Sequence, residues 1–173
     1  MKNKPIQFIA IFAISYIGLN LLYQGFLYLY APLPDLFTVW VTKATLYFLP
    51  ELHSRELVGT AGLQICEMNK PVVNVKEACN GIAVWISLLS FIIAFRSKIK
   101  LYLIFIPISF LVIQICNVLR LYILIRIRIQ SPQYFDFFHV YAFPAIIYFI
   151  AFLLMIVWVK MGELKSENRR IEK

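Results

Sequence analysis

The strongest constraint on the fold is a series of apolar runs that contain no Asp, Glu, Lys or Arg, such as residues 6–30 and 79–95. A helix rises 1.5 Å per residue, so about 20 apolar residues cross the ~30 Å hydrocarbon core of a bilayer. Hydrophobic residues make up 61% of the chain and charged residues 15%, against about 45–50% and 25% in soluble domains. A soluble fold of 173 residues could not bury so much apolar surface. We therefore predict an integral membrane protein.

The positions of the apolar runs predict an all-α fold, a polytopic transmembrane helical bundle in a single membrane domain over residues 1–173. About four spanning helices are expected. Residues 36–49 are apolar but too short to span, which indicates an interfacial or re-entrant helix. Alternation at residues 72–75 indicates one short strand in the polar stretch that follows. The expected spans cover residues 6–30, 79–95, 101–125 and 139–159, with connecting segments at 31–78 and 126–138 and a tail at 160–173.

Basic residues gather at the ends of the apolar runs, and membrane proteins keep such residues on the cytoplasmic side. An orientation with both termini inside places residues 31–78 and 126–138 outside, as a small extracytoplasmic loop region. The net charge of +8 then reflects topology and lipid contact, and no nucleic-acid-binding motif accompanies it. No cleaved signal peptide is expected, since the first apolar run is too long. The inside flanks hold ten of the 17 basic residues: Lys2, Lys4, Arg96, Lys98, Lys100, Lys160, Lys165, Arg169, Arg170 and Lys173.

This topology brings three chemically reactive side chains to one level of the membrane. Cys79 begins the second expected span at its outer end, and His139 begins the fourth. The third span runs outward and reaches Arg120 after about 30 Å of helix from Leu101. A thiol, a guanidinium and an imidazole should therefore meet near the outer membrane boundary.

These three side-chain types are suited to acyl transfer. A thiol at a helix N-terminus is stabilised as thiolate by the helix dipole, which favours Cys79 as a nucleophile. His139 could accept its proton and pass it to the leaving amine, and Arg120 could stabilise the oxyanion. Asn117 lies one turn from Arg120 on the same helix face and could orient it. No metal or cofactor is expected, because the sequence lacks a cluster of His and carboxylate ligands.

The residues around these positions resemble a known family. The run Glu77-Ala78-Cys79-Asn80-Gly81-Ile82 is similar to the E-A-C-[SN]-G-[IL] motif of the exosortase/archaeosortase family. Asn117-Val118-Leu119-Arg120 resembles its N-x-x-R element, and His139 resembles its third catalytic element. The resemblance covers roughly residues 60–160. The chain is short for this family.

The resemblance implies a membrane cysteine protease or transpeptidase of the bacterial inner membrane, with its active site facing the periplasm. Its substrates would be exported proteins that end in a sorting signal: a short motif, a transmembrane helix and a basic tail. By this resemblance Cys79 is the nucleophile, Arg120 the oxyanion stabiliser and His139 the acid and base. Asn117, Glu77 and Asn80 are the expected supporting residues.

Each of these residues also has a simpler interpretation. Cys79 could pair with Cys66 in a structural disulfide, and the chain would then be a non-catalytic membrane assembly or scaffold protein. Arg120 could reach lipid head groups, as we expect of Arg126 and Arg128. His139 could be one member of an interfacial aromatic belt. In the same terms Glu77 would be a solvated carboxylate, Cys116 a buried hydrophobe and His53 a solvated side chain.

Overall fold

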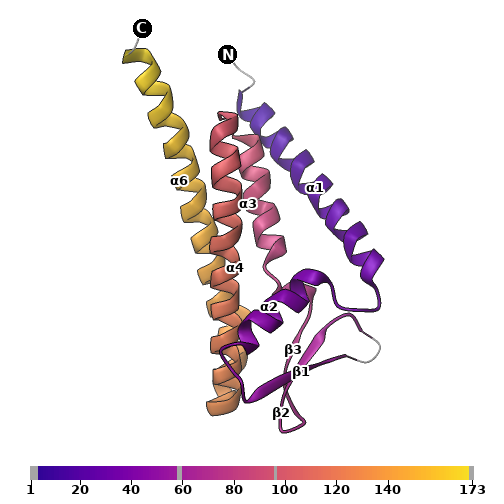
Figure 1. The fold of residues 1–173 in the computed structure, drawn as a ribbon. Coiled ribbons are helices and arrows are strands. Elements are labelled where there is room, and N and C mark those ends of the chain that lie inside the picture. Colours follow the sequence, from indigo (N-terminus) through magenta and orange to yellow (C-terminus); the bar gives the residue numbers. More distant parts are fainter. Residues whose placement is uncertain (1–3, 58–59, 96, 172–173) are drawn as a thin grey trace.

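The structure is a computed structural model that describes residues 4–57, 60–95 and 97–171. Helices α1 (Lys4–Tyr30), α4 (Ile99–Gln130) and α6 (Phe143–Ile171) surround the shorter α3 (Ile82–Ala94), which packs against all three. The beginning of α1, the α3–α4 connection and the end of α6 lie at one end of the molecule (Figure 1). A small sheet and α2 (Leu36–Leu46) lie at the other end.

Three helices in the described part of the chain are long and apolar enough to cross a membrane: Pro5–Tyr30, Ile99–Gln130 and Pro132–Gly162. The expected span at residues 79–95 is wrong in extent, because α3 has only 13 residues and is about 20 Å long. Its start is delayed by a 3₁₀ turn, η1 (Glu77–Cys79), and by Gly81, whose φ of 77° is left-handed. The helix therefore begins only at Ile82.

The segment expected as an outer loop, residues 126–138, is instead mostly helical. Helix α4 continues to Gln130, and the chain reverses at Ser131. The 3₁₀ turn η2 (Pro132–Tyr134), the short α5 (Phe135–Phe137) and the π-helical η3 (Phe138–Ala142) then lead into α6. Charged residues such as Arg126 and Arg128 interrupt the apolar pattern without breaking the helix. His139 consequently lies inside a helical segment and not at its start.

Residues 31–78 contain a sheet, so the fold is mostly helical and not all-α. Strands β1 (Leu52–Glu56), β2 (Leu63–Glu67) and β3 (Lys70–Val75) are antiparallel in the order β1-β2-β3. The strand expected at residues 72–75 is confirmed as part of β3, whereas β1 and β2 were not expected. The short apolar helix expected at residues 36–49 is confirmed as α2, whose first turn is capped by Asp35.

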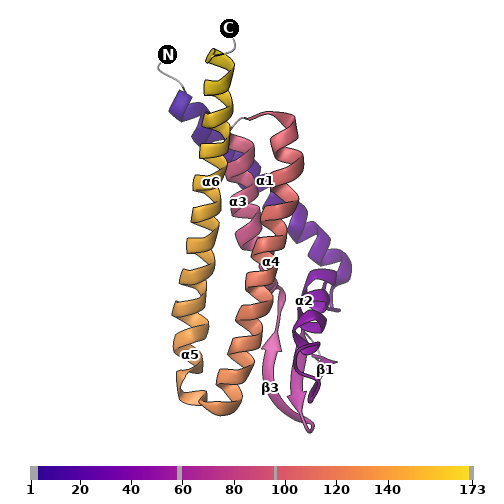
Figure 2. The ribbon, with the colours of Figure 1, turned by 60° about the vertical axis from the view of Figure 1, so that its left-hand side comes forward.

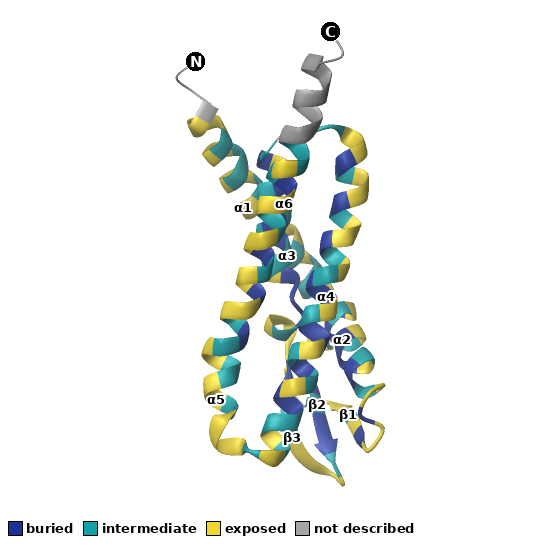
Figure 3. Ribbon diagram, turned by 90° about the vertical axis from the view of Figure 1, so that its left-hand side faces the viewer, coloured by how far each residue is buried: buried dark blue, intermediate teal, exposed yellow. Residues whose placement is uncertain are grey.

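Two apolar clusters hold these elements together, and α4 contributes to both. One joins α4 to α2 and the sheet and includes Ile65 and Leu121. The other joins α4 to α3 and α6, and its fully buried Trp158 donates a hydrogen bond of 3.1 Å from Nε1 to the carbonyl of Phe95. Figure 2 shows α4 between α6 and β3. Figure 3 shows exposed residues along the outer faces of the helices, as expected where lipid would solvate them.

The termini and the α3–α4 connection share one end of the molecule, as the prediction with both termini inside requires. Lys2, Arg96 and Lys173, which contribute to that prediction, lie outside the described residues. The side chains of Lys4, Lys165, Arg169 and Arg170 are likewise not described. The orientation in a membrane stays a prediction.

Candidate functional site

Cys79 closes the η1 turn that joins the sheet to α3. Its backbone N–H donates to the carbonyl of Lys76 at 2.8 Å, and its own carbonyl accepts from Asn117 Nδ2 at 2.7 Å. The side chain is half-buried and the thiol is free. Cys79 lies just before the N-terminus of α3, which begins at Ile82.

Asn80 fixes this turn to its surroundings. It is fully buried, its Nδ2 donates to the Tyr23 hydroxyl at 2.6 Å, and its Oδ1 accepts from the backbone N–H of Ile82 at 3.0 Å. The amide therefore satisfies the first backbone N–H of α3 and ties the start of this helix to α1. Asn80 therefore holds the turn that carries Cys79, although it does not itself line the cavity described below.

Arg120 approaches Cys79 from α4. It follows Asn117 by three residues, so the two side chains share a helix face. The guanidinium is close enough to the Cys79 thiol to interact with it electrostatically. Its Nε is buried and has no hydrogen-bond partner among the described residues. A buried donor without an acceptor costs free energy. We therefore expect the Arg120 Nε to donate to an oxygen atom of a ligand.

His139 comes from a third element, the π-helical segment η3. Such π-helical turns are rare and often mark functional sites. The imidazole is half-buried and stacks on Phe135 with ring centroids 5.4 Å apart. It interacts electrostatically with both Arg120 and Asp136. Arg120 and Asp136, which carry opposite charges, line the same cavity as His139.

A cavity of about 310 Å³ connects these side chains, which is within the size range of small ligand sites. The structure brings Cys79, Asn117, Arg120 and His139 together on its wall, as the sequence predicted. Glu77 is absent from this wall: it is exposed and borders a separate hollow beside Tyr28 and Asp35. The remaining lining residues are Val72, Val73, Asn74, Leu121, Leu124, Arg128, Phe135 and Asp136.

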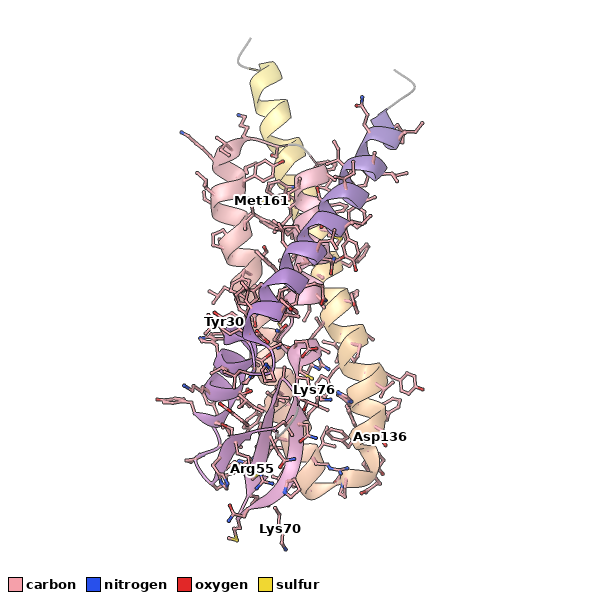
Figure 4. The ribbon with its side chains drawn as sticks, turned by 90° about the vertical axis from the view of Figure 1, so that its right-hand side faces the viewer. Tyr30, Arg55, Lys70, Lys76, Asp136 and Met161 are labelled. Atoms are coloured by element: carbon pink, nitrogen blue, oxygen red, sulfur yellow. The ribbon has the colours of Figure 1, made fainter. Side chains whose placement is uncertain are left out.

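Three polar residues of this wall were missed by the sequence analysis: Asn74, Arg128 and Asp136. Asp136 precedes His139 by three residues, a helical spacing that could have indicated a shared face had the segment been recognised as helix. Figure 4 shows Asp136 and Lys76, the residue before η1, in the half of the molecule away from Met161. Arg128 is exposed, and it packs its guanidinium over the Phe135 ring at 5.1 Å.

The cysteines do not form the disulfide considered as the alternative. Cys66, Cys79 and Cys116 are all free, and Cys66 is fully buried in β2. No group of three or more His, Cys, Asp or Glu side chains in the described ranges is arranged to hold a metal ion.

Comparison with protein-family models, with curated proteins and with solved structures returned no match. The resemblance to the exosortase/archaeosortase family rests on the motif residues alone and stays a prediction.

Proposed function

We propose that this chain is a membrane-embedded cysteine peptidase or transpeptidase that cleaves C-terminal sorting signals of exported proteins. One observation carries the proposal. A thiol, a guanidinium and an imidazole come from three separate elements and line one cavity. The residues are Cys79 from η1, Arg120 from α4 and His139 from η3. Their order and motifs are those that suggested the exosortase resemblance.

In the proposed reaction, His139 takes the proton of the Cys79 thiol, and the thiolate attacks the scissile carbonyl carbon. Negative charge moves onto the carbonyl oxygen, where the buried Nε of Arg120 can donate to it. The carbon–nitrogen bond then breaks, and His139 returns the proton to the leaving amine. The resulting thioester is resolved by water in a peptidase or by an amine in a transpeptidase.

The same site suits a substrate that is itself membrane-anchored. The cavity lies toward the end of the molecule that carries the sheet, away from the two termini. If the helix of a sorting signal lay beside α4 and α6, the substrate residues just outside the membrane would lie at the level of the cavity. The positive-inside rule would place the substrate's basic tail with this chain's own basic flanks, in the cytoplasm of a bacterial cell. The cavity would then face the periplasm.

The proposal is tested by processing of precursors in cells that carry the wild-type chain or a variant. Comparison of protein C-termini between wild type and Cys79→Ala would identify the precursors. Cys79→Ala, Arg120→Ala and His139→Ala should each leave full-length precursor. The chain offers a matched control for every change. Cys66→Ala, Arg126→Ala and His53→Ala replace the same residue types outside the cavity, and processing should continue in each.

Normal processing by Cys79→Ala, with the variant folded and inserted at the wild-type level, would contradict the proposal. Loss of processing in Cys66→Ala as well as Cys79→Ala would instead favour a structural role for both thiols.

A further inference from the structure

Strand β3 has an unpaired edge. It is the last strand in the order β1-β2-β3, and β2 is its single neighbour. No backbone hydrogen bond joins Lys70–Val75 to a described element other than β2. An edge strand of this kind presents N–H and C=O groups that can pair with another extended chain.

The unpaired edge borders the cavity that contains Cys79. Three consecutive residues, Val72, Val73 and Asn74, line it. Val72 and Val73 both pack on the apolar cluster, at the bulge of the strand, whereas the Asn74 side chain accepts a hydrogen bond from Gln64 on the exposed face of the sheet, at 2.9 Å. The side chains of Val73 and Asn74 point to opposite faces of the sheet, as successive strand residues do. A cavity that is lined by both residues therefore runs along the edge of the strand. A bulge opposite Ile65 and Cys66 bends the strand at this point.

The wall opposite β3 carries an unused acceptor. Asn117 is fully buried, and its Nδ2 is committed to the carbonyl of Cys79. Its Oδ1 is buried without a partner in the described part of the chain. The buried Nε of Arg120, one turn along the same helix, is an unused donor. Both side chains line the cavity, and a peptide backbone offers one donor and one acceptor per residue that could pair with them.

We propose that the substrate residues around the scissile bond bind as an extended strand added to the free edge of β3, with Asn117 Oδ1 accepting one of their backbone N–H groups. This inference rests on the proposed peptidase function and specifies the conformation in which the substrate is read. A helical segment does not fit, because its N–H groups already bond within the helix and its diameter is about 10 Å. The substrate must therefore be unwound where it is cut.

The test uses a peptide electrophile and leaves the protein unchanged at this site. An acetylated hexapeptide of Ala and Val with a C-terminal chloromethyl ketone alkylates a thiol, with loss of chloride as the sulfur–carbon bond forms. A series of such peptides carries one N-methyl group at each backbone position in turn. The protein is the full chain in detergent with Cys66→Ala and Cys116→Ala, so that mass spectrometry follows labelling of Cys79. Iodoacetamide, which has no backbone to pair, is the control reagent.

Alternate residues of an added strand turn their N–H groups toward the neighbouring strand, so the effect of N-methylation should alternate along the peptide. We expect the labelling rate to fall about tenfold at every second position and less than about twofold between them, since methylation both removes a donor and obstructs strand approach. The iodoacetamide rate gives the reactivity of Cys79 in the same protein, and each peptide rate is compared with it.

Equal effects at all positions, or none, would overturn the strand-addition proposal. Failure of every peptide to label a Cys79 that iodoacetamide alkylates would also overturn it, because main-chain pairing does not depend on side-chain sequence. So would a Cys79 that neither reagent alkylates. The peptidase function is judged separately by precursor processing. If labelling does not alternate along the peptide but precursors are processed, the peptidase function stands and strand addition fails. If labelling alternates but no precursor is processed, β3 binds peptides and the peptidase function fails.

Discussion

The substitution Gly81→Ala should destabilise the fold and disturb the site together. Gly81 has a φ of 77°, and the left-handed region costs a residue with a Cβ roughly 1–2 kcal/mol. A Cβ here would also lie 3.2 Å from Asn117 Cγ, closer than ordinary van der Waals contact. Displacing Asn117 weakens its 2.7 Å hydrogen bond to Cys79, whose net contribution is about 1 kcal/mol. We expect the free energy of unfolding to fall by about 2–3 kcal/mol from these effects combined.

The assay is denaturant unfolding in detergent, followed by circular dichroism, with the alkylation rate of Cys79 as a second readout. Gly25→Ala is the matched control, because no heavy atom lies within 4 Å of its added Cβ. Gly25 is inside α1, where alanine should be neutral or should stabilise by up to about 1 kcal/mol. Gly81→Ala should also change the alkylation rate of Cys79, whereas Gly25→Ala should leave it unchanged. Equal stability and equal alkylation for the two variants would refute the described geometry of the Cys79 turn.

Three further substitutions test the contacts that hold this site in place. Asn80→Ala should lower the free energy of unfolding by about 1–2 kcal/mol, because it removes the bonds to the Ile82 N–H and to α1; Asn20→Ala, which loses an exposed hydrogen bond to the Tyr16 carbonyl, should cost less than about 0.5 kcal/mol in the same titration. Trp158→Phe keeps a buried ring but loses the indole N–H bond to the end of α3, so a loss of about 1 kcal/mol is expected in thermal unfolding. Glu51→Gln should change the midpoint little, since the Glu51–Arg126 ion pair is exposed and such pairs contribute about 0–1 kcal/mol; a loss above 2 kcal/mol would contradict this.

Three helices of the described chain that are long and apolar enough to cross a membrane, and the meeting of the reactive residues, could be predicted from the sequence. Long uncharged runs leave few alternatives to spanning helices, and the alternation of their directions brings Cys79, Arg120 and His139 to one level. The structure places all three around one cavity. Only the residue order, the helical rise and the distribution of basic residues were needed for that prediction.

Other features depend on contacts between segments distant in sequence and could not be predicted. The turn before α3 is tied to α1 by the bond between Asn80 and Tyr23, which lies 57 residues away. Strands β1 and β2 carry polar residues such as Arg55 and Gln64, whose mutual hydrogen bonds on the exposed face appear only once the strands are paired. The charges of residues 126–138 resembled those of a loop because a long helix that continues beyond the apolar run has the same composition.

Glu77 shows the limit of reasoning from a motif. It belongs to the motif run that contains Cys79, yet it faces away from the cavity and borders another hollow. Asp136, outside every motif, lies beside His139. Adjacency in sequence therefore did not indicate the direction of each side chain.

The role of Cys79 as the nucleophile is tested most directly by trapping the thioester. The purified chain is mixed with a precursor identified from the Cys79→Ala cells, quenched in acid and measured by intact-protein and peptide mass spectrometry. We predict an adduct of the substrate's N-terminal fragment on Cys79, released by hydroxylamine and absent in Cys79→Ala. Cleavage of the precursor with no hydroxylamine-sensitive adduct on Cys79, or with the adduct on Cys66 or Cys116, would contradict the proposed function.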